Sequence, residues 1–264
     1  MARGLGSRMR READAALTNE QAAAAASGAK AMMPVASGRP FLDHVLTHLA
    51  DAGLVDVCLV IGPEHTAIRD YYDQLDPQRV RISFAEQAQP RGTADAVAAA
   101  GEFVGADRFV VVNGDNLYPT ASVRALIAEP GLATVGFHPD GLVTHSNIPV
   151  DRIRAFALLQ TDAAGELVNI VEKPTAEVAA ALSVAGTPLI SMNCWLLGPA
   201  AIEACGRIEP SPRGEFELAD AVRALLADRV PISVVPSQEG VWDLSSRGDV
   251  QAVTAALAGD RVAL

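Results

Sequence analysis

The sequence predicts an α/β fold built on a doubly wound, mostly parallel, Rossmann-like sheet, with a smaller antiparallel part in its second half. Short apolar runs alternate with amphipathic stretches over residues 40–137, and this pattern is typical of strands joined by helical crossovers. The run Val57–Gly62 is almost wholly apolar, as expected of a parallel strand buried on both faces. Apolar residues make up 50% of the 264, which is enough for a sizeable core.

The first half of the chain supplies most of the predicted parallel sheet. The segment Pro40–Gly53 places Leu42, Val45 and Leu49 at helical spacing and ends at a glycine, so it predicts a helix. The further strands expected here are Arg79–Phe84, Phe109–Val112 and Ala133–Phe137, and the further helices are Gly92–Gly101 and Thr120–Ala128. The alanine-rich stretch Gln21–Ala29 is interpreted as a helix or a mobile loop.

After about residue 140 the pattern becomes more antiparallel. The turn Asp162–Gly165 lies between strand-like runs Ile153–Gln160 and Leu167–Glu172, which favours a hairpin. The remaining expected elements are helices Ala176–Ala185, Phe216–Asp228 and Gly248–Ala258, and strands Leu189–Leu197 and Ile232–Val235.

Composition excludes several classes of protein. Asp and Glu number 32 against 21 Lys and Arg, and the net charge of −11 argues against nucleic-acid and anionic-membrane partners. No apolar run approaches the roughly 18 residues of a membrane span, and the N-terminus lacks a signal-peptide layout. The three cysteines (Cys58, Cys194 and Cys205) are not in metal spacing and are interpreted as buried thiols. We therefore expect a cytoplasmic protein.

Lysine is rare in this chain. Of the 21 basic residues, 19 are arginine, and the two lysines are Lys30 and Lys173. Where arginine serves for ordinary surface charge, a lysine can mark a position that needs a compact ammonium.

Several short phrases carry candidate chemistry. Gly4-x-Gly6 allows backbone N–H groups to approach an anion, and Arg8 can offer a bidentate fork to phosphate. The run Val110–Asn116 ends an apolar strand in Gly-Asp-Asn, which puts Asp115 at the carboxyl edge of the sheet as a possible Mg²⁺ ligand.

Three further phrases add polar groups elsewhere. Gln87 and the turn Pro90-Arg-Gly92 precede a helix, where a planar base could lie against the backbone. The phrase Glu172-Lys173-Pro174 ends a strand, and Trp242-Asp243 offers a second carboxylate far along the chain.

Taken in order, the phrases resemble the sugar-1-phosphate nucleotidyltransferase family, especially its glucose-1-phosphate thymidylyltransferase-like members. The resemblance covers essentially the whole chain, and both lysines fall on lysine positions of the family. The matching phrases are Gly4-Leu-Gly-Ser-Arg8, Lys30-Ala-Met-Met-Pro-Val35, Gly38-Arg-Pro40, Gln87, Pro90-Arg-Gly92, Gly114-Asp-Asn116, Glu172-Lys-Pro174, Asn193, Arg213-Gly-Glu-Phe-Glu-Leu-Ala-Asp220 and Trp242-Asp243.

The resemblance implies a role for each matched residue. The implied nucleotide-binding residues are Gly4, Gly6, Arg8, Gln87, Gly92 and Asp115, and those implied to bind the sugar phosphate are Glu172, Lys173, Asn193 and Glu215. The implied Mg²⁺ ligands are Asp115 and Asp243. The implied catalytic set is Arg8, Lys30, Asp115 and Lys173. It also implies a nucleotidyltransferase or GT-A-like sheet in a single domain over residues 1–264. Residues 1–140 would then mainly bind nucleotide, and residues 141–264 mainly the sugar phosphate.

Three departures from the family stand out. The family begins with an apolar strand, whereas only Met1-Ala2-Arg3 precedes Gly4, so the first strand is expected to be truncated. The interval between Arg8 and Lys30 is about twice the family's, through the insertion Arg11–Ala29, which we interpret as a mobile lid. Arg154-Ala155 replaces the glycine expected on the sugar side. Neither the base, the sugar or cyclitol, nor the oligomeric state follows from the sequence, and a homo-oligomer is possible.

The expected chemistry is transfer of a nucleotidyl group from a nucleoside triphosphate to a sugar-1-phosphate or cyclitol phosphate, giving an NDP-sugar and pyrophosphate. Two alternatives stay open: a non-catalytic regulatory homologue that binds an NDP-sugar, and a GT-A-type glycosyltransferase. A regulatory homologue would be expected to lack Arg8, Lys173 or an aspartate, and none of these is missing. A glycosyltransferase would be expected to carry two carboxylates one residue apart at the metal strand, where Gly114-Asp115-Asn116 offers one.

Overall fold

The computed structural model describes residues 1, 9, 17–27, 30–183 and 188–264 of the chain. Its α-helices are α2 (Asn19–Ser27), α3 (Phe41–Ala52), α4 (Thr66–Leu75), α5 (Thr93–Ala99), α6 (Gly101–Val104), α7 (Thr120–Ala128), α8 (Pro139–Thr144), α9 (Ala176–Ser183), α10 (Pro199–Arg207), α11 (Leu218–Ala227) and α12 (Asp249–Ala256). Its strands are β1 (Asp56–Ile61), β2 (Arg81–Glu86), β3 (Phe109–Val111), β4 (Asn116–Leu117), β5 (Leu132–Phe137), β6 (Ala157–Thr161), β7 (Leu167–Val171), β8 (Leu189–Leu197), β9 (Ile232–Ser237) and β10 (Trp242–Asp243). The same described residues also contain the short 3-10 helices η1 (Lys30–Met32), η2 (Ala36–Gly38) and η3 (Val150–Ala155).

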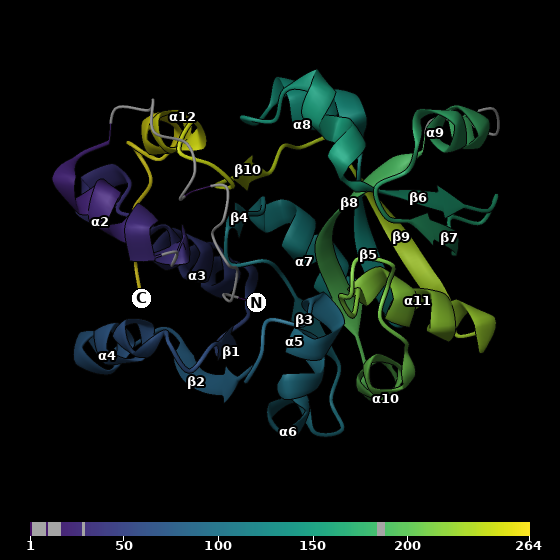
Figure 1. The fold of residues 1–264 in the computed structure, drawn as a ribbon, viewed down its shortest axis with the longest axis horizontal. Coiled ribbons are helices and arrows are strands. Elements are labelled where there is room, and N and C mark those ends of the chain that lie inside the picture. The colour runs from purple at the N-terminus through teal and green to yellow at the C-terminus, as the bar shows by residue number, and fades with distance from the viewer. Residues whose placement is uncertain (2–8, 10–16, 28–29, 184–187) are drawn as a thin grey trace.

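The main sheet runs in the order β7-β6-β8-β5-β9, and β3 also pairs with β8. Strands β5 and β9 are parallel, while β8 is antiparallel to β5, β6 and β3. Strands β6 and β7 form the antiparallel hairpin that the sequence predicts around Asp162–Gly165. Strands β1 and β2 form a separate parallel pair, and β4 pairs with β10 (Figure 1). The α/β class is confirmed.

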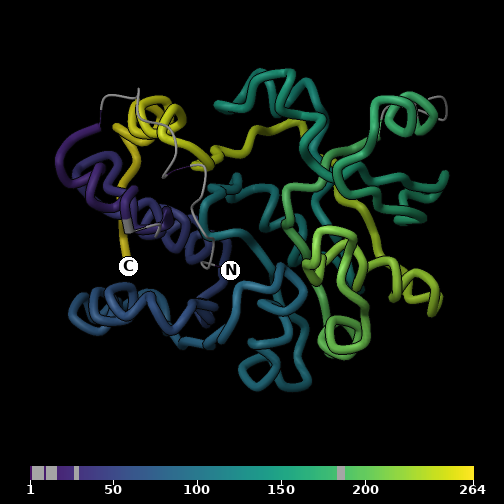
Figure 2. The backbone as a smooth tube through the Cα atoms, in the orientation of Figure 1, coloured from purple at the N-terminus to yellow at the C-terminus, as the bar shows by residue number. Residues whose placement is uncertain are grey.

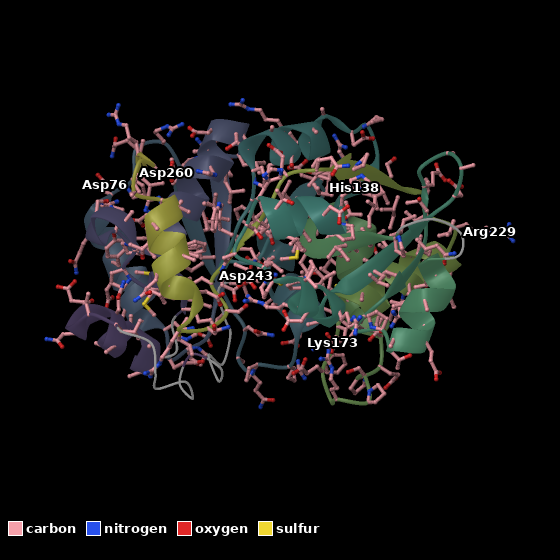
Figure 3. The ribbon with its side chains drawn as sticks, turned by 90° about the horizontal axis from the view of Figure 1, so that it is seen from above. Asp76, His138, Lys173, Arg229, Asp243 and Asp260 are labelled. Carbon is pink, nitrogen blue, oxygen red and sulfur yellow. The ribbon has the colours of Figure 1, made fainter. Side chains whose placement is uncertain are left out.

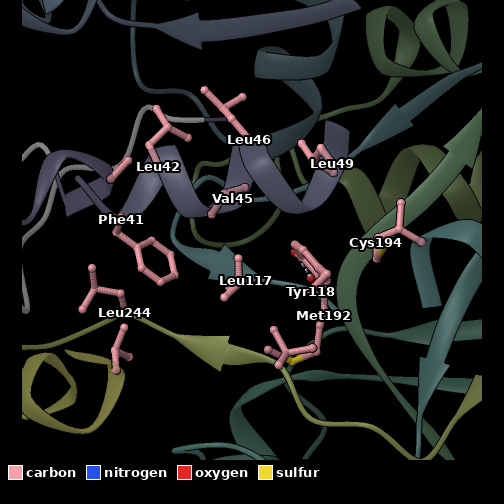
Figure 4. Packing of buried hydrophobic residues seen from close by; sticks show 14 of the residues in the cluster. Phe41, Leu42, Val45, Leu46, Leu49, Leu117, Tyr118, Met192, Cys194 and Leu244 are labelled. Carbon is pink, nitrogen blue, oxygen red and sulfur yellow. Dashed lines mark hydrogen bonds between the residues drawn. The ribbon is translucent and has the colours of Figure 1, made fainter. Parts of the chain in front are cut away.

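Strand β8 is buried on both faces because its apolar side chains alternate between two cores. Ile190, Met192, Cys194 and Leu196 belong to the core that α3 and α7 cover. Trp195 and Leu197 face the opposite core, where α5, α10 and α11 pack together. On the first of these faces, Figure 4 shows α3 lying over β4, with Tyr118 and Met192 beneath it. Helix layers on both faces of the sheet are the doubly wound arrangement expected from the sequence.

An opening separates β1 from β3. The two strands belong to different sheets, and a cavity of about 590 Å³ between them is lined by residues of both, among them Val57, Leu59 and Val110. The start of the chain lies at this cavity, in the middle of the molecule (Figure 2). The ammonium of Met1 donates to the carbonyl of Val112 at 2.7 Å, and Gly114 N donates to the carbonyl of Met1 at 2.7 Å.

Most predicted elements are present, several with shifted ends. Helix α7 and strand β8 have the predicted bounds, and α3 differs by one residue at each end. The stretch Ile153–Ala155 was wrongly predicted as strand and lies in η3, because the chain turns there before β6 begins at Ala157. Cys194 and Cys205 are buried as predicted, whereas Cys58 is only partly buried. Within the part of the chain that the structure describes, every helix is too short or too polar to span a bilayer.

Candidate functional site

The predicted aspartate Asp115 lies in the loop that leaves β3 at its carboxyl end. This loop is fixed by Tyr118, whose hydroxyl accepts from Asn113 N at 3.2 Å and donates to the carbonyl of Met192 at 2.6 Å. Burial raises the pKa of the Tyr118 hydroxyl well above its usual value, so it remains a neutral donor. The side chain of Asp115 is 31% exposed and open to a ligand.

The second predicted aspartate, Asp243, is adjacent to this loop. Strand β10 pairs with β4 so that Asp243 lies opposite Asn116, and Leu244 N donates to the carbonyl of Asp115 at 2.9 Å. Burial raises the pKa of Asp243, and the nearby negative charge of Asp115 raises it further. Figure 3 shows Asp243 in the middle of the molecule, between its two halves.

The carboxylate of Asp243 already has hydrogen-bond donors on both oxygens. Oδ1 accepts from Asn116 Nδ2 at 3.0 Å, and the Ser245 hydroxyl lies 2.8 Å from Oδ1 and 2.9 Å from Oδ2. The guanidinium of Arg152 donates to Oδ2. The carboxylate of Asp115 can take a metal as it stands, whereas Oδ2 of Asp243 is already contacted by the Arg152 guanidinium. Among the described residues, no three or more His, Cys, Asp or Glu side chains gather in a way that could hold a metal.

Lys30 lies beside Asp115. Its ammonium nitrogen is 3.5 Å from Asp115 Oδ2, and the lysine side chain is 17% exposed. The segment that follows η1 is fixed to the start of α3, since Phe41 N donates to the carbonyl of Met33 at 2.9 Å. The other predicted residues of this part, Gly4, Gly6 and Arg8, lie outside the described residues.

The two residues expected at the base, Gln87 and Gly92, are in contact. The Gln87 amide donates to the carbonyl of Gly92 at 3.0 Å and to Asp95 Oδ2 at 2.8 Å. Gly92 has φ 118°, and a Cβ there would lie 2.5 Å from the carbonyl oxygen of Phe216, so only glycine fits. Beside this turn is a cavity of about 460 Å³, lined partly by Gln87, Arg91 and Asp95.

Three of the four residues expected at the sugar phosphate form a charged cluster. Lys173 has φ 44° and a half-exposed side chain whose ammonium is 4.0 Å from Glu172 Oε1. Arg213 lies 3.9 Å from Glu172 and 4.0 Å from Glu215, and it also donates to Glu217. Burial and the charge of Glu217 raise the pKa of Glu172.

The fourth residue, Asn193, lies within β8 at φ 57°, beside an irregularity in its pairing with β5. Its Oδ1 accepts from Trp195 Nε1 at 3.4 Å. Asparagine tolerates this left-handed conformation, which a β-branched residue would not.

The base-side turn and the sugar-side segment are tied together through backbone hydrogen bonds. Phe216 N donates to the carbonyl of Arg91 at 2.7 Å, and Ala94 N donates to the carbonyl of Phe216 at 2.9 Å. Leu218 N donates to Thr93 Oγ1 at 2.8 Å. These two segments, which are more than a hundred residues apart in the sequence, are therefore held next to each other.

Sequence reasoning missed Arg152, Arg213 and Tyr118 as members of this region. Arg213 was inside a recognised phrase without an assigned role. Arg152 and Tyr118 act through contacts with residues 91 and 74 positions away, and no local spacing connects such partners.

Comparisons with known proteins agree with the resemblance. The family model described as nucleotidyl transferase matches residues 25–245. The glucose-1-phosphate thymidylyltransferase of Streptomyces griseus is 30% identical over 217 residues, which are 82% of this chain and 56% of that protein. A low-salt glycan biosynthesis nucleotidyltransferase of Haloferax volcanii is 28% identical over 219 residues, with the same two shares. The chain spans about half the length of these relatives.

A solved structure shares the fold. The crystal structure of UDP-glucose pyrophosphorylase complexed with UDP-glucose superposes with a TM-score of 0.74 at 17% identity, covering 98% of this chain and 97% of that one. At this level of identity the likeness concerns the fold alone.

Proposed function

The chain belongs to the sugar-1-phosphate nucleotidyltransferase family, and we propose that it transfers a nucleotidyl group from a nucleoside triphosphate to a sugar-1-phosphate or cyclitol phosphate. The products are an NDP-sugar and pyrophosphate. The observation that carries the proposal is the placement of Lys30 beside Asp115, 3.5 Å apart. Together they put an ammonium and a partly exposed carboxylate at the edge of the sheet, where open α/β folds bind ligands.

The reaction needs positioning and charge neutralisation more than acid–base groups. An oxygen of the sugar phosphate attacks the α-phosphorus in line, the bond to the pyrophosphate breaks, and that anion leaves. A phosphate monoester is already an adequate nucleophile, so no general base is assigned. Lys30, with Arg8, offsets the charge that develops on the triphosphate, and Lys173 holds the incoming phosphate.

The remaining assignments divide between the base-side turn and the sugar-side segment. Gln87 and Gly92, with Gly4 and Gly6, bind the nucleotide. Glu172, Asn193 and Glu215 contact the sugar hydroxyls. The names of the relatives suggest glucose-1-phosphate with dTTP or UTP as the first substrates to try.

We propose Mg²⁺ as the cofactor, held by Asp115 and, once Asp243 Oδ2 is free, by Asp243. Carboxylate oxygens are the ligands that Mg²⁺ prefers, and the bound ion would neutralise phosphate charge. The three cysteines are free thiols, which is in keeping with a reducing compartment, and we place the reaction in the cytoplasm.

Asp115→Asn tests the proposal, since it replaces an anionic ligand with a neutral amide of equal size. NDP-sugar formation, followed by chromatography of the nucleotides, should fall by about 10²–10³-fold. Asp76→Asn is the control, because Asp76 is exposed at the end of α4 with φ 46°, where asparagine is well tolerated.

The same assay separates the alternatives. A regulatory homologue would bind an NDP-sugar and give no product, and a glycosyltransferase would release a nucleoside diphosphate from an NDP-sugar. Native activity in Asp115→Asn would contradict the role assigned to this aspartate.

A further inference from the structure

The guanidinium of Arg152 contacts two buried carboxylates at the candidate metal position. Arg152, in η3, donates from Nη1 to Asp249 Oδ1 at 2.8 Å and from Nη2 to Asp243 Oδ2. The arginine side chain is 20% exposed, whereas those of Asp243 and Asp249 are 4% and 7% exposed. The pair of contacts is a charge-assisted fork of the kind that arginine makes to two acceptors at once.

The two carboxylates hold the arginine differently. Asp249 is itself fixed at the start of α12, since its Oδ2 accepts from Ser246 N at 2.7 Å and its Oδ1 accepts from Asn147 Nδ2 at 2.9 Å. Asp243 instead faces the loop of Asp115. One arm of Arg152 is therefore anchored on Asp249, and the other lies on the oxygen that a metal would need.

We propose that Arg152 is a built-in counter-cation for Asp243, which a divalent cation must displace from Oδ2 in order to bind between Asp115 and Asp243. This rests on the proposed function, because the cation belongs to that site. The guanidinium balances two neighbouring carboxylates while the divalent cation is absent. Guanidinium and metal cannot share one lone-pair direction, and their charges repel each other, so each weakens the binding of the other. The Nη1 contact with Asp249 keeps the arginine nearby after displacement.

Binding of Mn²⁺ to the protein alone tests this inference. Mn²⁺ accepts oxygen ligands as Mg²⁺ does, and its free concentration can be read by electron paramagnetic resonance. No nucleotide or sugar phosphate is added. Arg152→Met removes the competing cation and should tighten Mn²⁺ binding by about tenfold or more, the scale of one charge-assisted hydrogen bond.

Arg154→Met is the matched control. Arg154 is exposed two residues further along the same 3-10 helix, and its loss should leave Mn²⁺ affinity close to the native value. Adding Asp115→Asn to Arg152→Met should remove the gain, which locates the ion at the predicted carboxylates. Unchanged or weaker Mn²⁺ binding in folded Arg152→Met would overturn the inference.

Removal of Arg152 leaves two buried carboxylates without their cation, so folding must be checked by thermal unfolding. Arg152→Gln keeps a neutral donor and should show a smaller gain in the same direction. If neither variant folds alone, Mn²⁺ should restore the native unfolding transition, and its failure to do so contradicts the inference. The Mn²⁺ titration contains no substrate, so its result is independent of turnover. If Arg152→Met binds Mn²⁺ more tightly but the unsubstituted protein forms no NDP-sugar in the activity assay, the proposed function is rejected and the role of Arg152 stands.

Discussion

An apolar strand fused ahead of Met1 should stabilise this protein, because it would enter the opening between β1 and β3 and replace a buried amine whose protonation costs stability. The ammonium of Met1 already makes one backbone contact of such a strand, by donating to Val112. In a fused chain the same nitrogen becomes a peptide N–H that can keep this hydrogen bond without carrying a charge.

The size of the charge effect follows from the pKa of Met1. Burial lowers the pKa of its ammonium from 8.0 to about 6. The unfolded amine is protonated below about pH 8 and the folded one only below about 6, so stability is lost as the pH falls through this window. The total loss is roughly 3 kcal/mol, and about half of it is already present at pH 7. Each apolar side chain that the strand buries adds about 1.5–3 kcal/mol, offset by about 1–2 kcal/mol for each ordered residue.

Urea unfolding of three chains measures both effects between about pH 6 and 8. The chains are the one that begins at Met1, one with an apolar strand of about six residues added, and one with a Gly/Ser segment of equal length added. The free energy of unfolding of the Gly/Ser chain should lose its pH dependence and show no further gain. That of the apolar chain should lose its pH dependence and also rise at every pH. The reasoning is refuted if native stability is flat over this range, or if the apolar chain is no more stable than the Gly/Ser chain.

Three other changes test the site. Lys173→Arg should raise KM for the sugar phosphate by about tenfold in steady-state kinetics with little change in kcat, since a planar fork cannot replace a compact ammonium; an unchanged KM would remove Lys173 from the phosphate. Gly92→Ala should lower the free energy of unfolding in urea by at least about 1–3 kcal/mol and weaken nucleotide binding, because the new Cβ meets the Phe216 carbonyl. Gly165→Ala is the control: Gly165 also has a positive φ but lies in open space, so its substitution should leave nucleotide binding unchanged. Hydrogen exchange over residues 11–29 should slow when nucleotide binds if this insertion closes over the triphosphate, and equal rates with and without nucleotide would count against a lid.

The fold was predictable where local pattern and tertiary burial agree. Strand β8 is apolar throughout and is buried on both faces, so its bounds followed from its residues. Helix α4 was missed because Ile68 and Tyr72 are its only fully buried side chains, too few for a helical pattern. Ile153 was assigned to a strand as the start of the run before the hairpin turn, yet it lies in η3, and β6 begins only at Ala157.

The site was predictable only as a set of phrases. The family resemblance assigned Lys30 and Asp115 to one catalytic set and Gln87 and Gly92 to the nucleotide, and their roles stay predictions. In the structure Lys30 lies 3.5 Å from Asp115, and Gln87 donates to the carbonyl of Gly92. No phrase indicated that Arg152 lies on Asp243, because that contact joins residues 91 positions apart, and side-chain pairing of this kind depends on the packed fold.

Pyrophosphate release from a matrix of nucleoside triphosphates and sugar-1-phosphates is the most direct measurement of nucleotidyl transfer. Release should require both substrates together, stop when the divalent cation is chelated, and yield one NDP-sugar per pyrophosphate. Release without a sugar phosphate, or none with any combination, would contradict nucleotidyl transfer as the function of this chain.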